Sequence, residues 1–188
     1  MTWDGREIQS RLPTPTWRRY EQTVAGLQSI LLGTSGLGVL AAVALALTLG
    51  RGRLADQHRA ADAARALSLA LEVQVAHFGE ELVMGFQRRF PEFLGLEPWS
   101  TTFFVAFNGA CIVAWLIARP ALRRCRRWAL FPAWFLALAA IANGIAHPLL
   151  AVATRGYFPG LLTSPLLGLA GLTLARRLTI ATARDQDA

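Results

Sequence analysis

Charged residues are absent from long blocks of this chain. Residues 24–49, 100–118, 128–154 and 156–175 carry no charge, and residues 66–86 are apolar apart from a few polar side chains. An α-helix needs about 20 apolar residues to cross the hydrocarbon core of a bilayer. The pattern therefore predicts an all-α integral membrane protein, a helical bundle with five transmembrane helices.

The same blocks divide the chain into segments. We expect a polar N-terminal tail, a first transmembrane helix, a charged connector, a membrane domain of four helices and a polar C-terminal tail, over residues 1–23, 24–49, 50–65, 66–177 and 178–188. The alternative for the first helix is a cleaved signal peptide, but the apolar part of such a peptide normally runs only about 7–15 residues. The alanines of the connector suggest that the second helix begins inside it.

Composition supports the membrane class. Hydrophobic residues make up 54% of the chain and charged residues 16%, whereas soluble proteins average about 25% charged residues. The formal net charge is +7, and all 19 basic residues are arginines. Such a basic chain invites a nucleic-acid interpretation, but the arginines lie in the gaps between apolar blocks, where membrane topology accounts for them. We therefore expect the lipid bilayer as a partner and no nucleic acid.

The arginines also predict an orientation. With five spans, the N-terminal tail and the loops after the second and fourth spans hold 7 arginines, and the other three polar segments hold 12. Positive residues favour the cytoplasmic side. We therefore expect a multi-pass protein of the cytoplasmic membrane, with the N-terminus outside and the C-terminus in the cytoplasm.

The segment 66–86 carries an unusual polar cluster for a membrane helix. At about 100° per residue, His77, Glu80 and Glu81 share one helix face. A charged side chain at the centre of a bilayer costs roughly 2.5–3.5 kcal/mol on insertion scales. The two glutamates therefore need partners from other helices.

Depth in the membrane indicates which residues these partners are. At about 1.5 Å per residue, Glu81 lies roughly 22 Å from one surface of a core about 30 Å thick, and Asn108 roughly 10 Å from the opposite surface. Asn143 reaches nearly the same level as Glu81, and His147 follows it by one helical turn. We expect one pocket in which the catalytic and metal-binding residues are His77, Glu80, Glu81 and His147, with Asn108 and Asn143 as hydrogen-bond partners behind them.

Two imidazoles and two carboxylates form a ligand set suited to a divalent metal ion such as zinc, iron or manganese. Such an ion would offset the charge of the glutamates and lower the pKa of a bound water to about 7. The favoured hypothesis is a metal-dependent, hydrolase-like enzyme acting on a lipid or isoprenoid-like substrate. The alternatives are a proton-coupled transporter and a helix-packing or accessory protein without turnover. Small residues in the first span, such as Gly33 and Gly36, would permit a homo-oligomer.

Two short motifs resemble a known family. The run from His77 to Glu81, with glutamates at its last two positions, resembles the motif that names the HXXEE family of small bacterial multi-pass membrane proteins. His147 followed by Tyr157 and Pro159-Gly160 resembles its second signature. The resemblance covers roughly residues 66–177. It implies a four-helix core, a bacterial membrane and a shared His/Glu site supported by Tyr157, but no substrate.

A fainter similarity connects the chain to intramembrane CAAX-type proteases, which also combine adjacent glutamates, histidines and an asparagine. The chain departs from that pattern in two ways. Gly85 stands where that family has an arginine, and Asn143 precedes His147 instead of following it. The similarity is therefore limited to the types of residue present and does not extend to their order or spacing.

Overall fold

The structure, a computed structural model, describes residues 16–51, 53–54 and 56–183, and all regular elements in these ranges are helices. They are α2 (Thr16–Gly33), α3 (Ser35–Arg51), α4 (Gln57–Met84), α5 (Phe86–Phe93), α6 (Thr101–Arg123), the short 3-10 helix η1 (Arg127–Ala129), α7 (Leu130–Ala153) and α8 (Ser164–Ala181). The predicted all-α class is confirmed. Residues 1–15 of the expected N-terminal tail lie outside the described residues.

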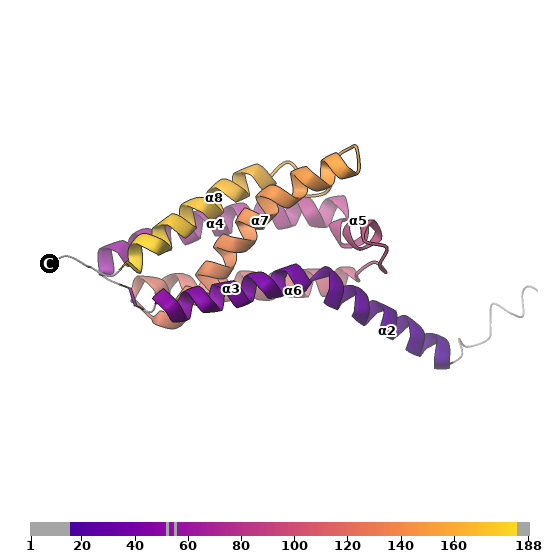
Figure 1. Cartoon of the computed structure of the whole chain (residues 1–188), viewed down its shortest axis with the longest axis horizontal. Helices are drawn as coiled ribbons and strands as arrows, with labels where there is room; N and C mark the ends of the chain where they lie inside the picture. Colours follow the sequence, from indigo (N-terminus) through magenta and orange to yellow (C-terminus); the bar gives the residue numbers. More distant parts are fainter. Residues whose placement is uncertain (1–15, 52, 55, 184–188) are drawn as a thin grey trace, which may run out of the picture.

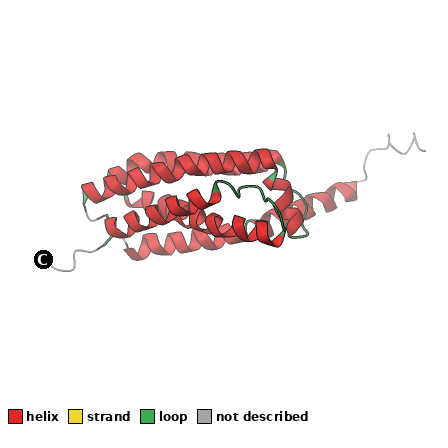
Figure 2. Ribbon diagram, turned by 90° about the horizontal axis from the view of Figure 1, so that it is seen from above, coloured by secondary structure: helices red, strands yellow, loops and turns green. Residues whose placement is uncertain are grey.

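The long helices run roughly along one axis. Figure 1 shows α4 and α8 along one side of the bundle, α3 and α6 along the other, and α7 crossing obliquely between them. Seen from above, the helices form an elongated bundle, and loops cluster at the end that carries α5 (Figure 2). This end also contains the C-terminal halves of α4 and α7.

The predicted first span is a broken helix. α2 and α3 meet at Thr34 with a bend of 45°. The Thr34 hydroxyl donates a hydrogen bond of 2.6 Å to the carbonyl of Ile30, one turn earlier. Such back-bonding by threonine bends helices, and the neighbouring Gly33 weakens the helix further.

α4 begins inside the charged connector, as its alanines suggested, and ends sharply. Its N-cap is Asp56, whose side chain accepts from the backbone N–H of Arg59, so most of the expected connector is helical. At the other end, Gly85 adopts a left-handed conformation (φ 78°), and its N–H donates to the carbonyl of Glu81. Glycine adopts this conformation without steric cost. The chain can therefore turn into α5 four residues after Glu81.

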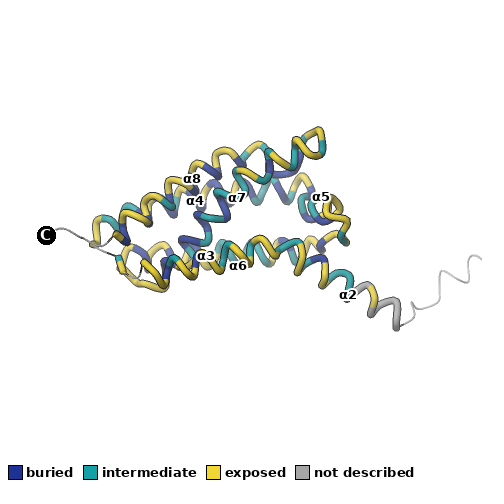
Figure 3. Tube along the Cα trace, viewed as in Figure 1, coloured by how far each residue is buried: buried dark blue, intermediate teal, exposed yellow. Residues whose placement is uncertain are grey.

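Glycines allow α7 and α8 to pack closely. A Cβ atom built on Gly144 would lie 2.7 Å from the Cα of Gly168, and one built on Gly171 would lie 2.8 Å from the carbonyl oxygen of Ala137. Figure 3 shows buried positions where α4, α7 and α8 face one another. The α7–α8 contact therefore depends on the absence of side chains at these crossing points.

The last helix begins later than predicted. We expected a span over residues 156–175, but α8 starts at Ser164. Residues 154–163 form turns instead, with positive φ at Arg155 and Gly160. The absence of charge in this segment reflects burial against the bundle, because Phe158 and Pro159 are almost fully buried.

Two helical segments, Thr101–Arg123 and Arg127–Ala153, are long and apolar enough to cross a membrane, and the bent pair Thr23–Gly33 and Ser35–Arg51 adds a third if it counts as one span. This is consistent with a membrane protein, but it does not confirm five spans. α4 carries Glu72 and two further glutamates in its apolar part, and the uncharged part of α8 covers only residues 164–175.

Candidate metal centre

Three predicted ligands meet inside the bundle. His77 and Glu81 lie one turn apart on α4, and His147 projects from α7. The Oε1 atom of Glu81 lies 3.5 Å from Nε2 of His77 and 3.4 Å from Nε2 of His147. All three side chains are buried. Among the described residues, this is the group of His, Cys, Asp and Glu side chains whose ligand atoms gather within 4.8 Å.

The outer nitrogen of each imidazole has a defined partner. Nδ1 of His147 lies 2.6 Å from the carbonyl oxygen of Pro159, which can only accept a hydrogen bond. Nδ1 of His77 lies 2.8 Å from the hydroxyl oxygen of Thr163. That hydroxyl donates its own hydrogen to Glu80 at 2.6 Å, so it accepts from His77. Both Nδ1 atoms therefore carry hydrogen.

The inner nitrogens are then lone-pair donors in the neutral imidazoles. Nε2 of His77 is buried and has no hydrogen-bond partner, and Nε2 of His147 faces the same carboxylate. An ionised carboxylate also offers lone pairs alone. Three electron-pair donors thus converge without a hydrogen between them, and buried polar atoms of this kind need a compensating partner. A cation at the centre of the three would satisfy all of them, whereas a single bound proton would pair only two.

Glu80 lies outside this three-residue cluster, although the sequence placed it among the metal ligands. Its carboxylate accepts four hydrogen bonds, of 2.6–3.0 Å, from the Tyr157 hydroxyl, the N–H of Leu162, and both the N–H and the hydroxyl of Thr163. Negative charge is favourable at the N-terminus of a helix. Glu80 therefore holds the segment that leads into α8, and through Thr163 it fixes the orientation of His77.

Tyr157 connects this segment to α4. Its hydroxyl donates to Oε1 of Glu80 at 2.7 Å. Burial, followed by the hydrogen bond to Glu80, raises the pKa of Tyr157 to about 12. Tyr157 therefore stays protonated and remains a donor at neutral pH. The structure places it beside Glu80, and Glu80 and Thr163 stand between its hydroxyl and the His77 imidazole.

Gly160 allows the loop to pass directly over both histidine rings. Its φ of +91° favours glycine, and a Cβ atom at this position would lie 2.4 Å from Cε1 of His147 and 2.8 Å from Cε1 of His77. The preceding carbonyl, that of Pro159, accepts the His147 hydrogen bond. The Pro-Gly pair therefore both orients one imidazole and covers the two.

Aromatic rings also pack against the cluster. The rings of His77 and His147 meet edge to face, with centroids 4.7 Å apart. Phe86 lies 5.5 Å from the His147 ring, and Phe158 lies 6.4 Å from it. This apolar shell lowers the local dielectric, which strengthens electrostatic interactions inside it.

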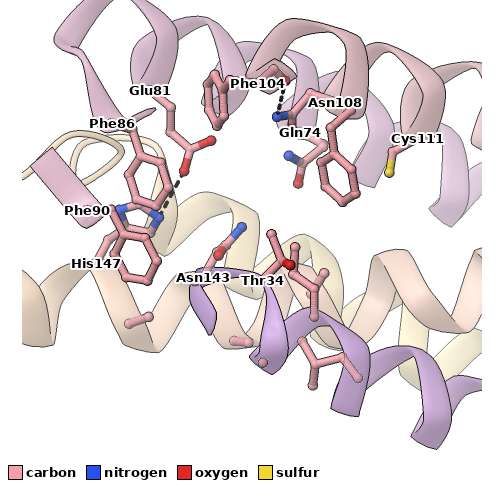
Figure 4. A pocket seen from close by; sticks show the side chains of 18 of the residues that line it. Thr34, Gln74, Glu81, Phe86, Phe90, Phe104, Asn108, Cys111, Asn143 and His147 are labelled. Carbon is pink, nitrogen blue, oxygen red and sulfur yellow. Dashed lines mark hydrogen bonds and ion pairs between the residues drawn. The ribbon is translucent and has the colours of Figure 1, made fainter. Parts of the chain in front are cut away.

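A cavity of about 370 Å³ adjoins the cluster and is lined by Glu81 and His147. Figure 4 shows both side chains at one end, with Asn143, Gln74 and Asn108 further along the walls. Asn108 donates to the carbonyl of Phe104 on its own helix at 3.0 Å. Both asparagines thus lie on the cavity wall, beside the cluster rather than bonded to it.

Sequence reasoning missed Thr163, the Pro159 carbonyl and Gln74. Thr163 and Pro159 lie in the segment that we expected to be helical, where their contacts with α4 and α7 could not be foreseen. Gln74 lies seven residues before Glu81, two turns along the same face of α4. This spacing of seven residues could have indicated that Gln74 faces the same side of α4 as Glu81.

The middle of the chain matches a known family. Residues 68–174, more than half of the chain, match the model of a family described as a protein of unknown function with an HXXEE motif. The match includes the three clustered residues and the segment that covers them, whereas α2 and α3 precede it. No curated protein and no solved structure matches the chain.

Proposed function

This chain belongs to the HXXEE family, whose function is unknown, and we propose that it is a membrane-embedded, metal-dependent hydrolase acting on a lipid-like substrate. One observation carries the proposal. The lone pairs of His77, Glu81 and His147 point at one another with no hydrogen between them. A divalent cation at their centre would satisfy all three donors and offset the buried carboxylate.

The two separations from the Glu81 oxygen are compatible with a tetrahedral ion such as zinc. Two ligands about 2.1 Å from an ion are about 3.4 Å apart in a tetrahedron and about 3.0 Å apart at the right angle of an octahedron. The measured separations from the Glu81 oxygen are 3.4 and 3.5 Å. Two histidines and one glutamate form a ligand set of catalytic zinc sites, which keep their fourth position open to water or substrate.

The surroundings of the cluster fit a hydrolytic role. A bound divalent ion supplies Lewis acidity, which lowers the pKa of water to about 7. Glu81 and His147 line the adjoining cavity, so a substrate there would reach the open position. Thr163 and the Pro159 carbonyl hold the two imidazoles with Nε2 inward, a support that metal-binding histidines usually have.

We also propose that α4 and α8 cross the membrane together with α6, α7 and the α2–α3 pair, which gives five spans. Three of the polar groups on α4 fit this arrangement, because His77 and Glu81 are buried inside the bundle and Glu80 is paired with the loop before α8. With the arginine-rich ends in the cytoplasm, the cluster would lie nearer the outer surface. The N-terminus would then be outside and the C-terminus inside.

Metal analysis of the purified protein tests the proposal. We expect about one zinc ion per chain in the wild type and less than a tenth of that in Glu81→Gln, because the amide lacks the anionic donor. Zinc added at 100 times its Kd to the metal-stripped wild type should stabilise it by about 2.7 kcal/mol, and the variant should gain nothing. The wild type should also hydrolyse a chromogenic long-chain acyl ester in detergent micelles, and Glu81→Gln should not.

Glu72→Gln is the matched control, because Glu72 lies on the same helix and is exposed away from the cluster. It should keep the metal, the stabilisation and the hydrolysis. A wild-type protein that stays free of metal after exposure to zinc, iron and manganese would overturn the metal centre. Metal binding without ester hydrolysis would overturn the hydrolase and favour a transport or structural role.

Thr163→Val tests whether the chain orients His77 from behind. The substitution removes the hydroxyl that accepts from Nδ1 of His77 and leaves that buried N–H unpaired. We expect zinc affinity to fall about 10- to 100-fold, measured by competition with a chromophoric chelator. Thr163→Ser keeps the hydroxyl and should bind zinc with nearly wild-type affinity. Equal affinities in the two variants would contradict the orienting role.

A further inference from the structure

The cavity beside the cluster has the size and lining of a small-molecule site. Its volume of about 370 Å³ lies in the range of roughly 300–1,000 Å³ that is typical of ligand pockets. Six helices, α2 to α7, contribute to its walls, and most of the lining side chains are apolar or aromatic. Because Glu81 and His147 form one end, a ligand in this cavity would meet the proposed metal centre.

Uncommitted amide groups lie between the cluster and the rest of the cavity. Gln74 and Asn143 both line the cavity, and neither makes a hydrogen bond to the described part of the chain. Asn108 uses one amide hydrogen on its own helix and keeps its carbonyl oxygen free. Amides buried beside apolar walls are costly unless they are paired. Gln74 and Asn143 are therefore placed to pair with polar atoms of a ligand.

The described part of the cavity wall offers no arginine to an anionic head group. None of the described residues that line it is an arginine, and its ionisable groups are Glu81, His147 and Cys111. Phosphates and carboxylates are normally recognised by arginine or by lysine. In this chain the arginines gather at the bundle ends, and Arg89 lies over the Phe158 ring at 5.6 Å. A neutral hydrogen-bonding head group suits the amides.

The rest of the cavity is shaped for a hydrocarbon chain. Its lining along α6 runs from Phe103 to Trp115, which is about 18 Å at the helical rise per residue. Leu40 from α3 and Phe135 from α7 complete the apolar walls at the far end. α3 lies before the family match, so one wall of the cavity comes from outside the matched residues.

We infer that the substrate is a long-chain lipid with an uncharged carbonyl head group, an acyl ester or acyl amide, rather than a phospholipid or an isoprenoid diphosphate. The inference rests on the proposed function. The carbonyl lies at Glu81 and His147, the polar atoms beside it pair with Gln74 and Asn143, and the hydrocarbon chain follows α6 toward Trp115.

The reaction that follows is ordinary hydrolysis. The oxygen of a water molecule forms a bond to the carbonyl carbon, and the bond from that carbon to the ester oxygen or amide nitrogen breaks. One proton of the water passes to the leaving alcohol or amine.

Photolabelling of the full chain in lipid nanodiscs tests the inference. The probe is a long-chain methyl ketone with a diazirine at the chain end, because a ketone keeps the carbonyl but has no bond to hydrolyse. We expect labelling near Cys111 and Trp115, mapped by peptide mass spectrometry. The unlabelled ketone should compete, whereas the fatty acid of equal length and an alkyl diphosphate should compete at least tenfold less well.

Matched variants locate the probe. Ala142 lines the cavity, so Ala142→Trp should abolish the labelling, whereas Ala114→Trp, on the exposed face of α6, should leave it unchanged. Replacing both Gln74 and Asn143 with leucine should weaken ketone competition about tenfold, since the carbonyl loses its hydrogen-bond partners.

Two outcomes would overturn the inference while leaving the metal centre intact. One is zinc binding without labelling of the cavity, and the other is stronger competition by the fatty acid or the diphosphate. If the protein binds no zinc but labelling and competition follow the expected order, the inferred ligand class is supported and the metal-dependent hydrolase is contradicted. The two proposals therefore fail separately.

Discussion

Gly160→Ala is expected to abolish metal binding, although Gly160 is not itself a ligand. The new methyl group would lie 2.4 Å from Cε1 and 2.6 Å from Nδ1 of His147, and 2.8 Å from Cε1 of His77. Real Cβ contacts are never so short, so the loop and both imidazoles must move apart. The metal content should fall below a tenth of the wild-type value, and zinc should no longer raise the Tm.

Gly95→Ala separates this contact from backbone strain. Gly95 also has a positive φ, +71°, but nothing lies within 4 Å of its added Cβ. Alanine in that conformation costs about 1–2 kcal/mol, a fall in Tm of roughly 2–8 °C for a domain of this size. Its metal content should stay normal. Equal metal loss in both variants would show that strain at a distance, and not the contact with the imidazoles, disrupts the centre.

Helical geometry explains which ligands could be predicted. His77 and Glu81 are four residues apart, so any helix over this segment places them together. His147 could be added because its depth matched theirs. Glu80 is a glutamate next to Glu81, but its side chain points about 100° away around the helix. The angles around the helix axis alone cannot tell which of two adjacent carboxylates faces the second histidine. The answer depends on the loop before α8, which donates four hydrogen bonds to the Glu80 carboxylate.

The missed parts of the site depend on irregular backbone. Residues 156–175 are uncharged. A run of apolar residues looks the same whether it forms one membrane helix or a buried loop followed by a shorter helix. Pro159 and Gly160 were the local signals of a turn. The loop is tolerated in the apolar interior because Glu80, His77 and His147 satisfy its polar groups. The contact between Glu80 and Thr163 joins segments about 80 residues apart in the chain. Local sequence patterns do not encode such contacts.

The broken first helix has a similar explanation. The composition of residues 24–49 is uniform enough to predict one span, and the bend arises from one hydroxyl, that of Thr34, bonded to the preceding turn. Trp99 also packs so close to Gly33 that a Cβ atom there would lie 2.4 Å from the indole ring. Because α2 turns away at this point, Gly33 and Thr34 form part of the cavity wall.

Gly144→Ala is expected to destabilise the bundle and weaken the metal centre together. The added Cβ would lie 2.7 Å from the Cα of Gly168 and 3.2 Å from the carbonyl oxygen of Ser164, and backbone atoms cannot move aside as a flexible side chain does. Overpacking of this kind costs about 1–3 kcal/mol, or roughly 2–12 °C in Tm. Because His147 follows Gly144 by one turn while its partner Pro159 leads into α8, separating the helices lengthens the hydrogen bond that orients the imidazole. Zinc affinity should fall at least tenfold, measured by chelator competition.

Gly109→Ala is the control for the intrinsic effect of the substitution in a helix. Gly109 lies within α6, and nothing lies within 4 Å of its added Cβ. Alanine is favoured over glycine in a helix by about 1 kcal/mol, so the Tm should stay unchanged or rise, with normal zinc affinity. If Gly144→Ala also rises in Tm and keeps its zinc affinity, the close approach of α7 and α8 is not what positions His147 against the loop. A fall in Tm with unchanged zinc affinity would instead show that the α4–α7 contact holds the ligands in place even when α8 moves away.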